Sequence, residues 1–271
     1  MKTLYISDLD GTLLRNDQKT SEYTNNVINA LLKKGVCFSF ATARSFHSAK
    51  NAASGITASF PLIVYNGAFI IDSNTKEMLL ENFHSNEEST SMLNELLEAN
   101  IYPVVYAYIE GNEKFSYLPK KINKATADFI ESRKNDFRNT PVKNESDLYK
   151  GKIFNIACIG EEEKLQPFFE KYKDKYHCVY QKDYYTNEQW LEIIPKSASK
   201  SNAIKKLAEI LSCDKIVSFG DGLNDIDMFI LSNEAYAVSN AVDELKKFST
   251  SVILSNEEDG VAKWLSENIK L

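Results

Sequence analysis

The segment L-Y-I-S-D-L-D-G-T-L-L, residues 4–14, decides the fold that we predict for this chain. Residues 4–6 form a short apolar run that stops at turn-forming residues, which is typical of a buried strand. Asp8 and Asp10 follow at its carboxyl end, and Gly11 and Thr12 come directly after them. Two carboxylates beside a buried sheet repel each other, and a cation that both could face would offset that cost. An isolated D-x-D pattern also fits an acidic loop that merely caps a hydrophobic strand.

Apolar strands alternate with helical patterns after this segment. Residues 22–34 carry apolar positions at helical spacing and end at Gly35, residues 36–41 and 61–65 are strand-like, and a second helix is expected at residues 45–53. This alternation predicts a doubly wound, mainly parallel, Rossmann-like α/β sheet with helices on both faces. Ligands bind outside the carboxyl ends of the strands in such sheets. Asp8, Thr42 and Asn66 each stand at such an end.

The pattern changes in the middle of the chain. A hairpin at residues 68–72 and 78–83 is followed by two helix-plus-strands units, in which Pro103 indicates an edge strand and residues 140–149 a loop. A parallel-sheet pattern then resumes with a helix at 200–212 and strands at 215–219, 235–238 and 252–254. We therefore predict a core domain of residues 1–83 and 191–271, with an α+β cap domain of residues 84–190 inserted into it.

Composition narrows the class of protein. The 271 residues are 43% hydrophobic and 26% charged with a net charge of −6, which suits a globular protein and argues against a nucleic-acid surface. The four cysteines are far apart and lack C-x-x-C spacing, so we expect neither zinc nor disulfides. The start of the sequence does not resemble a signal peptide, and no apolar run is long enough to span a bilayer. We expect a cytoplasmic protein without membrane or nucleic-acid partners, as a monomer or small homo-oligomer.

Four motifs in order resemble those of the haloacid dehalogenase-like phosphohydrolases. They are D-L-D-G-T at 8–12, Thr42, Lys200 within P-K-S-A-S-K-S, and G-D-G-L-N-D at 220–225. The large insert before Lys200, N-G-A at 66–68 and S-N-E-E-D-G-V-A at 255–262 are similar to the Cof-type branch, which carries an α+β cap at this point. Ala43 and Ser201 depart from that branch, which commonly has glycine there, and this puts only local backbone geometry in doubt.

The resemblance implies a role for each matched residue. Asp8 would be the nucleophile, Asp10 the general acid/base, and Thr42 and Lys200 would contact the phosphoryl oxygens. Mg²⁺ is the implied cofactor, because oxygen ligands with retained waters suit it. The resemblance implies that its ligands come from the following residues: Asp8, Asp10 through its backbone carbonyl, Asp221 and Asp225. Further substrate contacts are expected from the residues that flank these motifs: Ala43, Arg44, Asn66, Gly67 and Asn224.

Several of these residues have a purely structural alternative. Thr42 taken alone is an ordinary strand residue, Lys200 a solvated helix start, and Asn66 a turn cap, while Arg44 fits a salt bridge as well as a substrate contact. The three histidines show no ligand spacing, and we interpret them as structural or surface residues. The cap aromatics Tyr184, Tyr185 and Trp190 fit a cap core better than a platform for substrate.

The leading hypothesis is a Mg²⁺-dependent phosphatase that acts on a small phosphate ester, with a sugar phosphate as the default for this branch. A phosphomutase would use the same residues and stays open. A phospho-acceptor receiver module also uses Asp, Thr, Lys and Mg²⁺, but it is about half as long and needs no acid at Asp10. A binding protein that has lost catalysis is disfavoured, because every residue expected to react or ligate is present.

Overall fold

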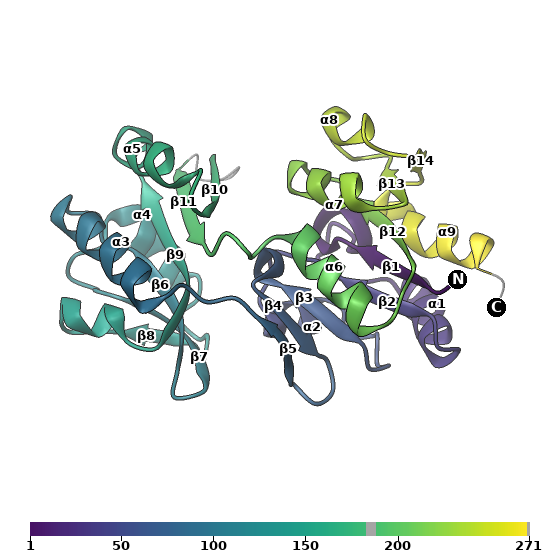
Figure 1. The fold of residues 1–271 in the computed structure, drawn as a ribbon, viewed down its shortest axis with the longest axis horizontal. Helices are drawn as coiled ribbons and strands as arrows, with labels where there is room; N and C mark the ends of the chain where they lie inside the picture. The colour runs from purple at the N-terminus through teal and green to yellow at the C-terminus, as the bar shows by residue number, and fades with distance from the viewer. Residues whose placement is uncertain (183–187, 270–271) are drawn as a thin grey trace. The chain divides into compact units, whose positions relative to one another are not determined.

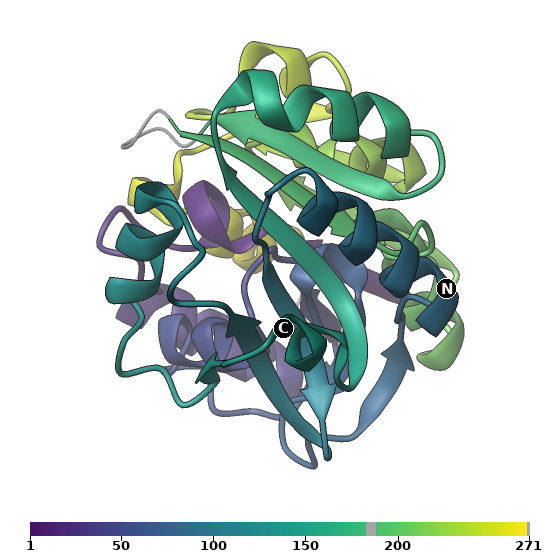
Figure 2. The same ribbon diagram turned by 90° about the vertical axis from the view of Figure 1, so that its left-hand side faces the viewer.

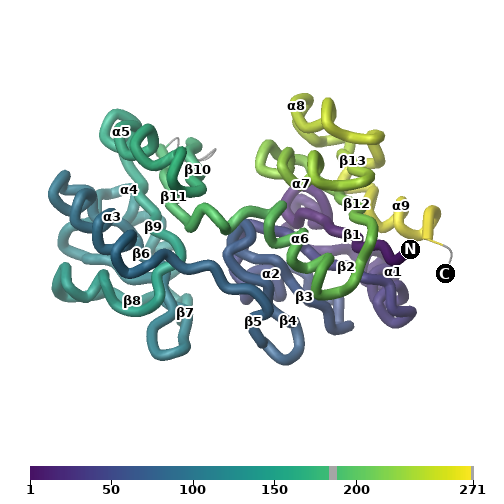
Figure 3. The backbone as a smooth tube through the Cα atoms, in the orientation of Figure 1, coloured from purple at the N-terminus to yellow at the C-terminus, as the bar shows by residue number. Residues whose placement is uncertain are grey.

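The computed structural model describes residues 1–182 and 188–269, and the chain divides into two compact units. The core unit comprises residues 1–81 and 198–271, and the cap unit comprises residues 82–197. The cap unit is an insertion, since the chain leaves the core unit after β5 (Met78–Glu81) and returns to it just before α6 (Lys200–Ile210) (Figures 1 and 3). Among the described residues, no helix has the length and apolar character that crossing a membrane requires.

The core unit is built on a five-stranded parallel sheet in the order β14-β13-β12-β1-β2. Its strands are β1 (Thr3–Ser7), β2 (Cys37–Phe40), β12 (Lys215–Gly220), β13 (Glu234–Val238) and β14 (Ser251–Ile253). The helices of this unit are α1 (Glu22–Lys33), α2 (Phe46–Ala52), α6, α7 (Ile226–Leu231), α8 (Asp243–Lys246) and α9 (Gly260–Asn268). The predicted α/β core with a mainly parallel sheet is confirmed.

The order of the strands reverses direction in the middle of this sheet. The chain moves from β1 to β2 in one direction and from β12 through β13 to β14 in the other. Because such crossovers are almost always right-handed, α1 and α7 cover opposite faces of the sheet. Helix α9 contacts α1, and α6 contacts α7, which completes the two helical layers (Figure 1). The reversal makes the border between β1 and β12 a topological switch point, where ligands bind in such sheets.

The third predicted parallel strand differs from the expectation. β3 (Pro61–Val64) joins the parallel sheet through a single bridge from Ala41 to Ile63 and pairs antiparallel with β4 (Phe69–Asp72), which in turn pairs with β5. The chain turns away from β2 directly after this bridge, where the Thr42 amide donates to the Ile63 carbonyl (3.0 Å). The predicted β4–β5 hairpin is confirmed.

The cap unit is a six-stranded sheet in the order β10-β11-β9-β6-β7-β8. Its strands are β6 (Val104–Ile109), β7 (Asn112–Tyr117), β8 (Asn139–Pro141), β9 (Lys152–Gly160), β10 (His177–Lys182) and β11 (Gln189–Ile194). Helices α3 (Asn86–Glu98) and α5 (Glu162–Tyr172) pack on one face around Leu93, Ile156 and Leu165, and α4 (Lys124–Glu131) packs on the other face around Phe115 (Figure 2).

Two sequence expectations for the cap were wrong. Pro103 does not mark an edge strand, because β6 begins at the next residue and lies between β7 and β9, where Pro103 need not donate to the ladder. Residues 140–149 are not simply a loop, since β8 pairs with β7 and a 3₁₀ helix spans Glu145–Tyr149. Segments this short carry no readable periodicity. Tyr184 and Tyr185 lie outside the described residues.

Candidate active site

The two motifs that contain carboxylates, at residues 8–12 and 220–225, meet at the switch point of the core sheet. Asp8 directly follows β1 and Asp221 directly follows β12, and these strands are neighbours with Ser7 opposite Phe219. The Asp8 amide donates to the Phe219 carbonyl (2.9 Å), which fixes the backbone where the two motifs meet. The parallel strands therefore deliver residues that are more than two hundred positions apart in the sequence to one place.

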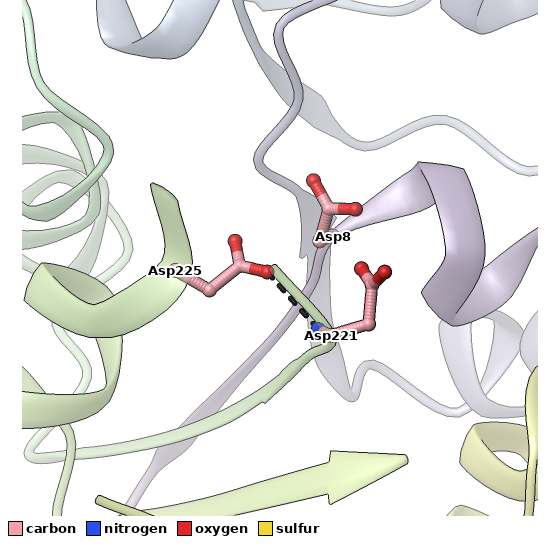
Figure 4. Close-up of side chains that lie close together, drawn as sticks. All are labelled: Asp8, Asp221 and Asp225. Carbon is pink, nitrogen blue, oxygen red and sulfur yellow. Dashed lines mark hydrogen bonds between the residues drawn. The ribbon is translucent and has the colours of Figure 1, made fainter. Parts of the chain in front are cut away.

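Three carboxylates lie together there. Asp8, Asp221 and Asp225 each offer an oxygen, and these atoms lie within 4.8 Å of one another (Figure 4). Asp225 is fully buried, and its Oδ2 accepts hydrogen bonds from the backbone amides of Asp221 and Gly222, both at 3.1 Å. Thr12 Oγ1 donates to Asp221 Oδ1 (2.8 Å). Two backbone amides therefore orient the Asp225 carboxylate, and the Thr12 hydroxyl orients that of Asp221.

Lys200 lies against this cluster. Its Nζ is 2.6 Å from Asp8 Oδ1 and 2.7 Å from Asp225 Oδ1, and its side chain is only 2% exposed. Lys200 is the first residue of α6, and the Ser199 side chain caps that helix by accepting from the Asn202 amide (3.1 Å). The start of α6 can lie this close to residue 67 because that residue is glycine. A Cβ at Gly67 would stand 2.1 Å from the Ser199 carbonyl oxygen.

Burial and neighbouring charge shift the pKa values of the cluster. Burial raises the pKa of Asp8 and the carboxylate of Asp225 raises it further, while Lys200 opposes both effects. Burial raises the pKa of Asp221 to about 6, against the hydrogen bond from Thr12. Burial alone would lower the Lys200 pKa, but Asp225 and Asp8 outweigh it, so the pKa rises. One ammonium faces three carboxylates, and this excess of negative charge with an all-oxygen donor set fits a divalent cation.

Asp10 lies outside this cluster. Its side chain is 51% exposed, and its two oxygens accept hydrogen bonds from Arg44, at 2.7 Å from Nε to Oδ2 and 2.5 Å from Nη2 to Oδ1. Arg44 also contacts Gln18 Oε1 (3.2 Å) and Ser48 Oγ (3.3 Å). The Asp10 carboxylate is therefore directed at Arg44. The atom of Asp10 that we predicted to be a metal ligand is a different one, its backbone carbonyl oxygen.

The ends of β2 and β3 are joined through Thr42 and Asn66. The Thr42 carbonyl accepts from the Asn66 amide (2.9 Å), and Thr42 Oγ1 accepts from the Arg44 amide (3.1 Å). Asn66 adopts a left-handed conformation with φ of +52°, and its buried Oδ1 has no hydrogen-bond partner. Of the other predicted contacts, Ala43 and Asn224 are exposed.

Thr12 and Asn240 hold the first motif in place, and no role was predicted for either from the sequence. Thr12 contacts Asp221 as described above, although it stands within the motif itself. Asn240 Nδ2 donates to the Gly11 carbonyl (2.8 Å), and Asn240 Oδ1 accepts from the Asn256 amide (3.1 Å). Asn240 lies just beyond the carboxyl end of a strand. The same feature led us to predict Thr42 and Asn66 as site residues, so it could also have identified Asn240.

Comparison with known proteins agrees with this geometry. A family described as haloacid dehalogenase-like hydrolase matches residues 5–265. The Bacillus subtilis protein named 5-amino-6-(5-phospho-D-ribitylamino)uracil phosphatase YwtE is 27% identical over 98% of both chains. The crystal structure of TM0651 from Thermotoga maritima superposes with a TM-score of 0.81 at 26% identity, covering 100% of this chain and 98% of that one.

A second solved structure is similar in fold. The sugar phosphatase BT4131, described as a subclass IIB haloacid dehalogenase superfamily member, gives a TM-score of 0.71 at 19% identity over 98% of each chain. The resemblance that the four motifs indicated is confirmed over nearly the whole length. The chain belongs to the haloacid dehalogenase-like hydrolases and is an enzyme of that family.

Proposed function

We propose that the protein is a Mg²⁺-dependent phosphatase that hydrolyses a small phosphorylated metabolite through an aspartyl-phosphate on Asp8. One observation carries this proposal: the buried Lys200 ammonium contacts Asp8 and Asp225 within a cluster that also holds Asp221. A nucleophilic carboxylate, a cationic side chain for phosphoryl oxygens and a set of oxygen ligands are the parts that phosphoryl transfer needs. The phosphatase names of relatives support the same reaction.

Charge repulsion sets the main barrier to this chemistry. A carboxylate that approaches a phosphate dianion at ~4 Å, with an effective dielectric constant of ~20, meets a repulsion on the order of 8 kcal/mol. That energy corresponds to several factors of ten in rate. A Mg²⁺ held by Asp8, Asp221, Asp225 and the Asp10 carbonyl would neutralise this charge when bound. Lys200 would stabilise the charge that spreads over the transferring group, and the Thr42 hydroxyl would orient it by hydrogen bonding.

The reaction then proceeds in two displacements. An oxygen of Asp8 attacks phosphorus, the bond to the ester oxygen breaks, and Asp10 gives its proton to that leaving oxygen. Asp10 next removes a proton from water, whose oxygen attacks the same phosphorus, so that inorganic phosphate leaves and the Asp8 carboxylate is regenerated. The fork of Arg44 on Asp10 would orient this acid/base. We further propose that Arg44, Asn66, Gly67 and Asn224 border the substrate, and that the exposed Ala43 contributes backbone.

The names of two similar proteins support a substrate class for this chain. YwtE is named for a phosphorylated ribityl compound, and BT4131 is described as a sugar phosphatase. We therefore propose a sugar or sugar-alcohol phosphate as the substrate, with the cap domain of residues 84–190 selecting its organic part and limiting water. We also propose that the protein is cytoplasmic and is a monomer or small homo-oligomer, as expected from the sequence.

A phosphate-release screen tests the proposal. Purified protein is incubated with sugar phosphates, nucleotides and aryl phosphates, with Mg²⁺ or with EDTA, beside the Asp8→Asn variant. We expect release that requires Mg²⁺ and is lost in the variant. Equal activity in wild type and variant would remove Asp8 from the mechanism. Transfer to an added sugar acceptor in preference to water would indicate a phosphomutase.

A further inference from the structure

The segment that carries Asp10 turns sharply at Gly11. The turn closes where the Leu14 amide donates to the Leu9 carbonyl (2.8 Å). Within it, Asp10 has a ψ of 121° and Gly11 a φ of +75°, so neither is helical. The glycine is required, because a Cβ there would stand 2.4 Å from Asp221 Oδ2. A glycine backbone rotates more freely than that of other residues, so the turn alone does not fix the backbone beside Asp10.

Asn240 holds this turn from outside. Its Nδ2 donates to the Gly11 carbonyl (2.8 Å), and its Oδ1 accepts from the Asn256 amide (3.1 Å). Both partners are backbone groups, a carbonyl that only accepts and an amide that only donates, so they fix the orientation of the side-chain amide. Asn240 follows β13 by two residues, and the Val242 amide just after it donates to the Asp221 carbonyl (3.0 Å). One short segment therefore contacts both motifs that contain carboxylates.

Asn256 supports both Asn240 and the end of the same turn. Asn256 is 5% exposed, and its Nδ2 donates to the carbonyl of Leu14, the residue at which the turn closes (2.9 Å). The neighbouring Glu257 accepts from the Asn16 amide through its Oε1 (2.6 Å). The two asparagines thus hold the turn at its middle and at its end.

A contribution to stability alone does not account for Asn240. The residue is exposed, and water can replace its hydrogen bond to Gly11, so that bond contributes little to the free energy of unfolding. Water cannot give the Gly11 carbonyl a fixed direction. Asn240 therefore restrains the backbone that follows Asp10, while Arg44 holds the carboxylate of the same residue (2.7 Å from Nε to Oδ2). Proton transfer depends on alignment of this kind.

We propose that Asn240 is a positioning residue for the acid/base Asp10, which it aligns through the Gly11 carbonyl. This inference rests on the proposed phosphatase function, in which Asp10 gives its proton to the leaving oxygen while the bond from that oxygen to phosphorus breaks. A poorly aligned acid slows this step most when the leaving group is strongly basic. An ester whose leaving group departs as a stable anion needs no proton and is insensitive to Asn240.

The test compares phenyl phosphate with p-nitrophenyl phosphate. The two esters are similar in shape, but phenolate is the more basic leaving group and gains more from a proton. In Asn240→Ala, kcat/KM should fall by about tenfold for phenyl phosphate and by less than about threefold for p-nitrophenyl phosphate. Asp10→Asn should show the same pattern with a larger loss. The ratio of the two kcat/KM values within one variant does not depend on the amount of folded protein.

A second variant separates the two hydrogen bonds of Asn240. Asn240→Asp keeps an acceptor for the Asn256 amide but loses the donor to the Gly11 carbonyl, so its kinetics should match those of Asn240→Ala. Asn233→Asp is the matched control. This exposed asparagine directly precedes β13, at the other end of the strand, and its Oδ1 accepts from the Ile216 amide (2.8 Å). Its ratio for the two esters should equal that of wild type.

Stability and kinetics together decide the outcome. The thermal midpoints of both Asn240 variants should lie within about 3 °C of wild type. The inference would be overturned by equal losses on the two esters, by no loss on either, by wild-type kinetics in Asn240→Asp, or by the same pattern in Asn233→Asp. In each of these cases the phosphatase function stands. A wild-type protein that releases no phosphate from any ester would instead refute the function, and with it the inference.

Discussion

Arg44 holds both carboxylate oxygens of Asp10 in a two-pronged hydrogen bond, at 2.7 Å and 2.5 Å. Asp8, only two residues earlier, contacts Lys200 instead. The two acids of the first motif thus have different cationic partners. Asp10 is half-exposed, whereas Asp8 is buried. Two identical groups in different surroundings can take different chemical roles, and here the surroundings favour Asp8 as nucleophile and Asp10 as acid/base.

Replacing Arg44 tests whether it positions Asp10. Arg44→Gln should lower kcat by about tenfold with a smaller effect on KM, since a loosely held acid/base transfers protons less efficiently. Because the two residues would act as one unit, the double variant with Asp10→Asn should be no slower than Asp10→Asn alone. Steady-state kinetics of the three variants measure this, and multiplicative losses would show that Arg44 acts independently of Asp10.

Asp10 and Asp221 should separate catalysis from metal binding. Asp10→Asn should slow turnover by at least ~10² and leave Mg²⁺ affinity largely intact, because only its backbone carbonyl is a proposed ligand. Asp221→Asn should weaken Mg²⁺ binding instead, since its carboxylate belongs to the three-acid cluster. Titration calorimetry with Mg²⁺ beside kinetics at saturating Mg²⁺ compares the two, and a similar loss of affinity in both variants would contradict this division.

Removing the Lys200 ammonium should destabilise the fold as well as abolish turnover. Lys200→Met leaves Asp8 and Asp225 buried without their cation, and breaking such a buried pair typically costs about 3–5 kcal/mol of unfolding free energy. Lys205→Met, at an exposed position on the same helix, should change stability by less than about 0.5 kcal/mol. Urea unfolding measures both, and Lys200→Met with Asp225→Asn should regain part of the loss.

Gly67 should matter through the space beside it and not only through its backbone conformation. Gly67 and Gly35 both have positive φ values, +96° and +80°, but a Cβ at Gly67 would strike the Ser199 carbonyl, whereas a Cβ at Gly35 would meet nothing within 4 Å. Gly35→Ala should therefore cost only the backbone strain of roughly 1–2 kcal/mol. Gly67→Ala should cost more and reduce kcat by moving the start of α6, and equal effects in unfolding and kinetic assays would argue against this contact.

His84 gives the cap a pH-dependent stability. Burial lowers the pKa of this histidine, although its ring contacts the Ile193 carbonyl (3.1 Å). The unfolded chain therefore takes up a proton near pH ~6.5 before the folded chain does, so this contribution is present above that pH and is lost as the pH falls toward the lower folded pKa. The loss can reach about 1.4 kcal/mol per pH unit.

The variant His84→Gln isolates this contribution. Denaturant unfolding at about pH 7 and pH 5 should show a smaller acid-induced loss of stability in His84→Gln than in wild type, while His47→Gln, at an exposed position on α2, should follow wild type. An identical pH dependence in all three proteins would mean that His84 does not contribute.

Local patterns predicted most of the core unit and of the candidate site. Asp8, Thr42 and Asn66 could be placed because apolar runs reveal strand ends, and strand ends in a parallel sheet share one edge. The fork between Arg44 and Asp10 could not be predicted, because it depends on how two loops face each other. The pairing of Tyr106 with Asn155 was equally hidden, since the register of β6 and β9 shifts between Tyr106 and Ala107. Such a bulge leaves no mark in an apolar pattern.

The central claim is that Asp8 carries the phosphoryl group during turnover. The most direct measurement is acid quenching of wild-type protein during hydrolysis of its best substrate with Mg²⁺, followed by peptide mass spectrometry. We predict a phosphoryl group on Asp8 that hydroxylamine removes, and its absence in Asp8→Asn. Steady phosphate release from wild type with no phosphoryl group on Asp8, together with full activity in Asp8→Asn, would contradict the account.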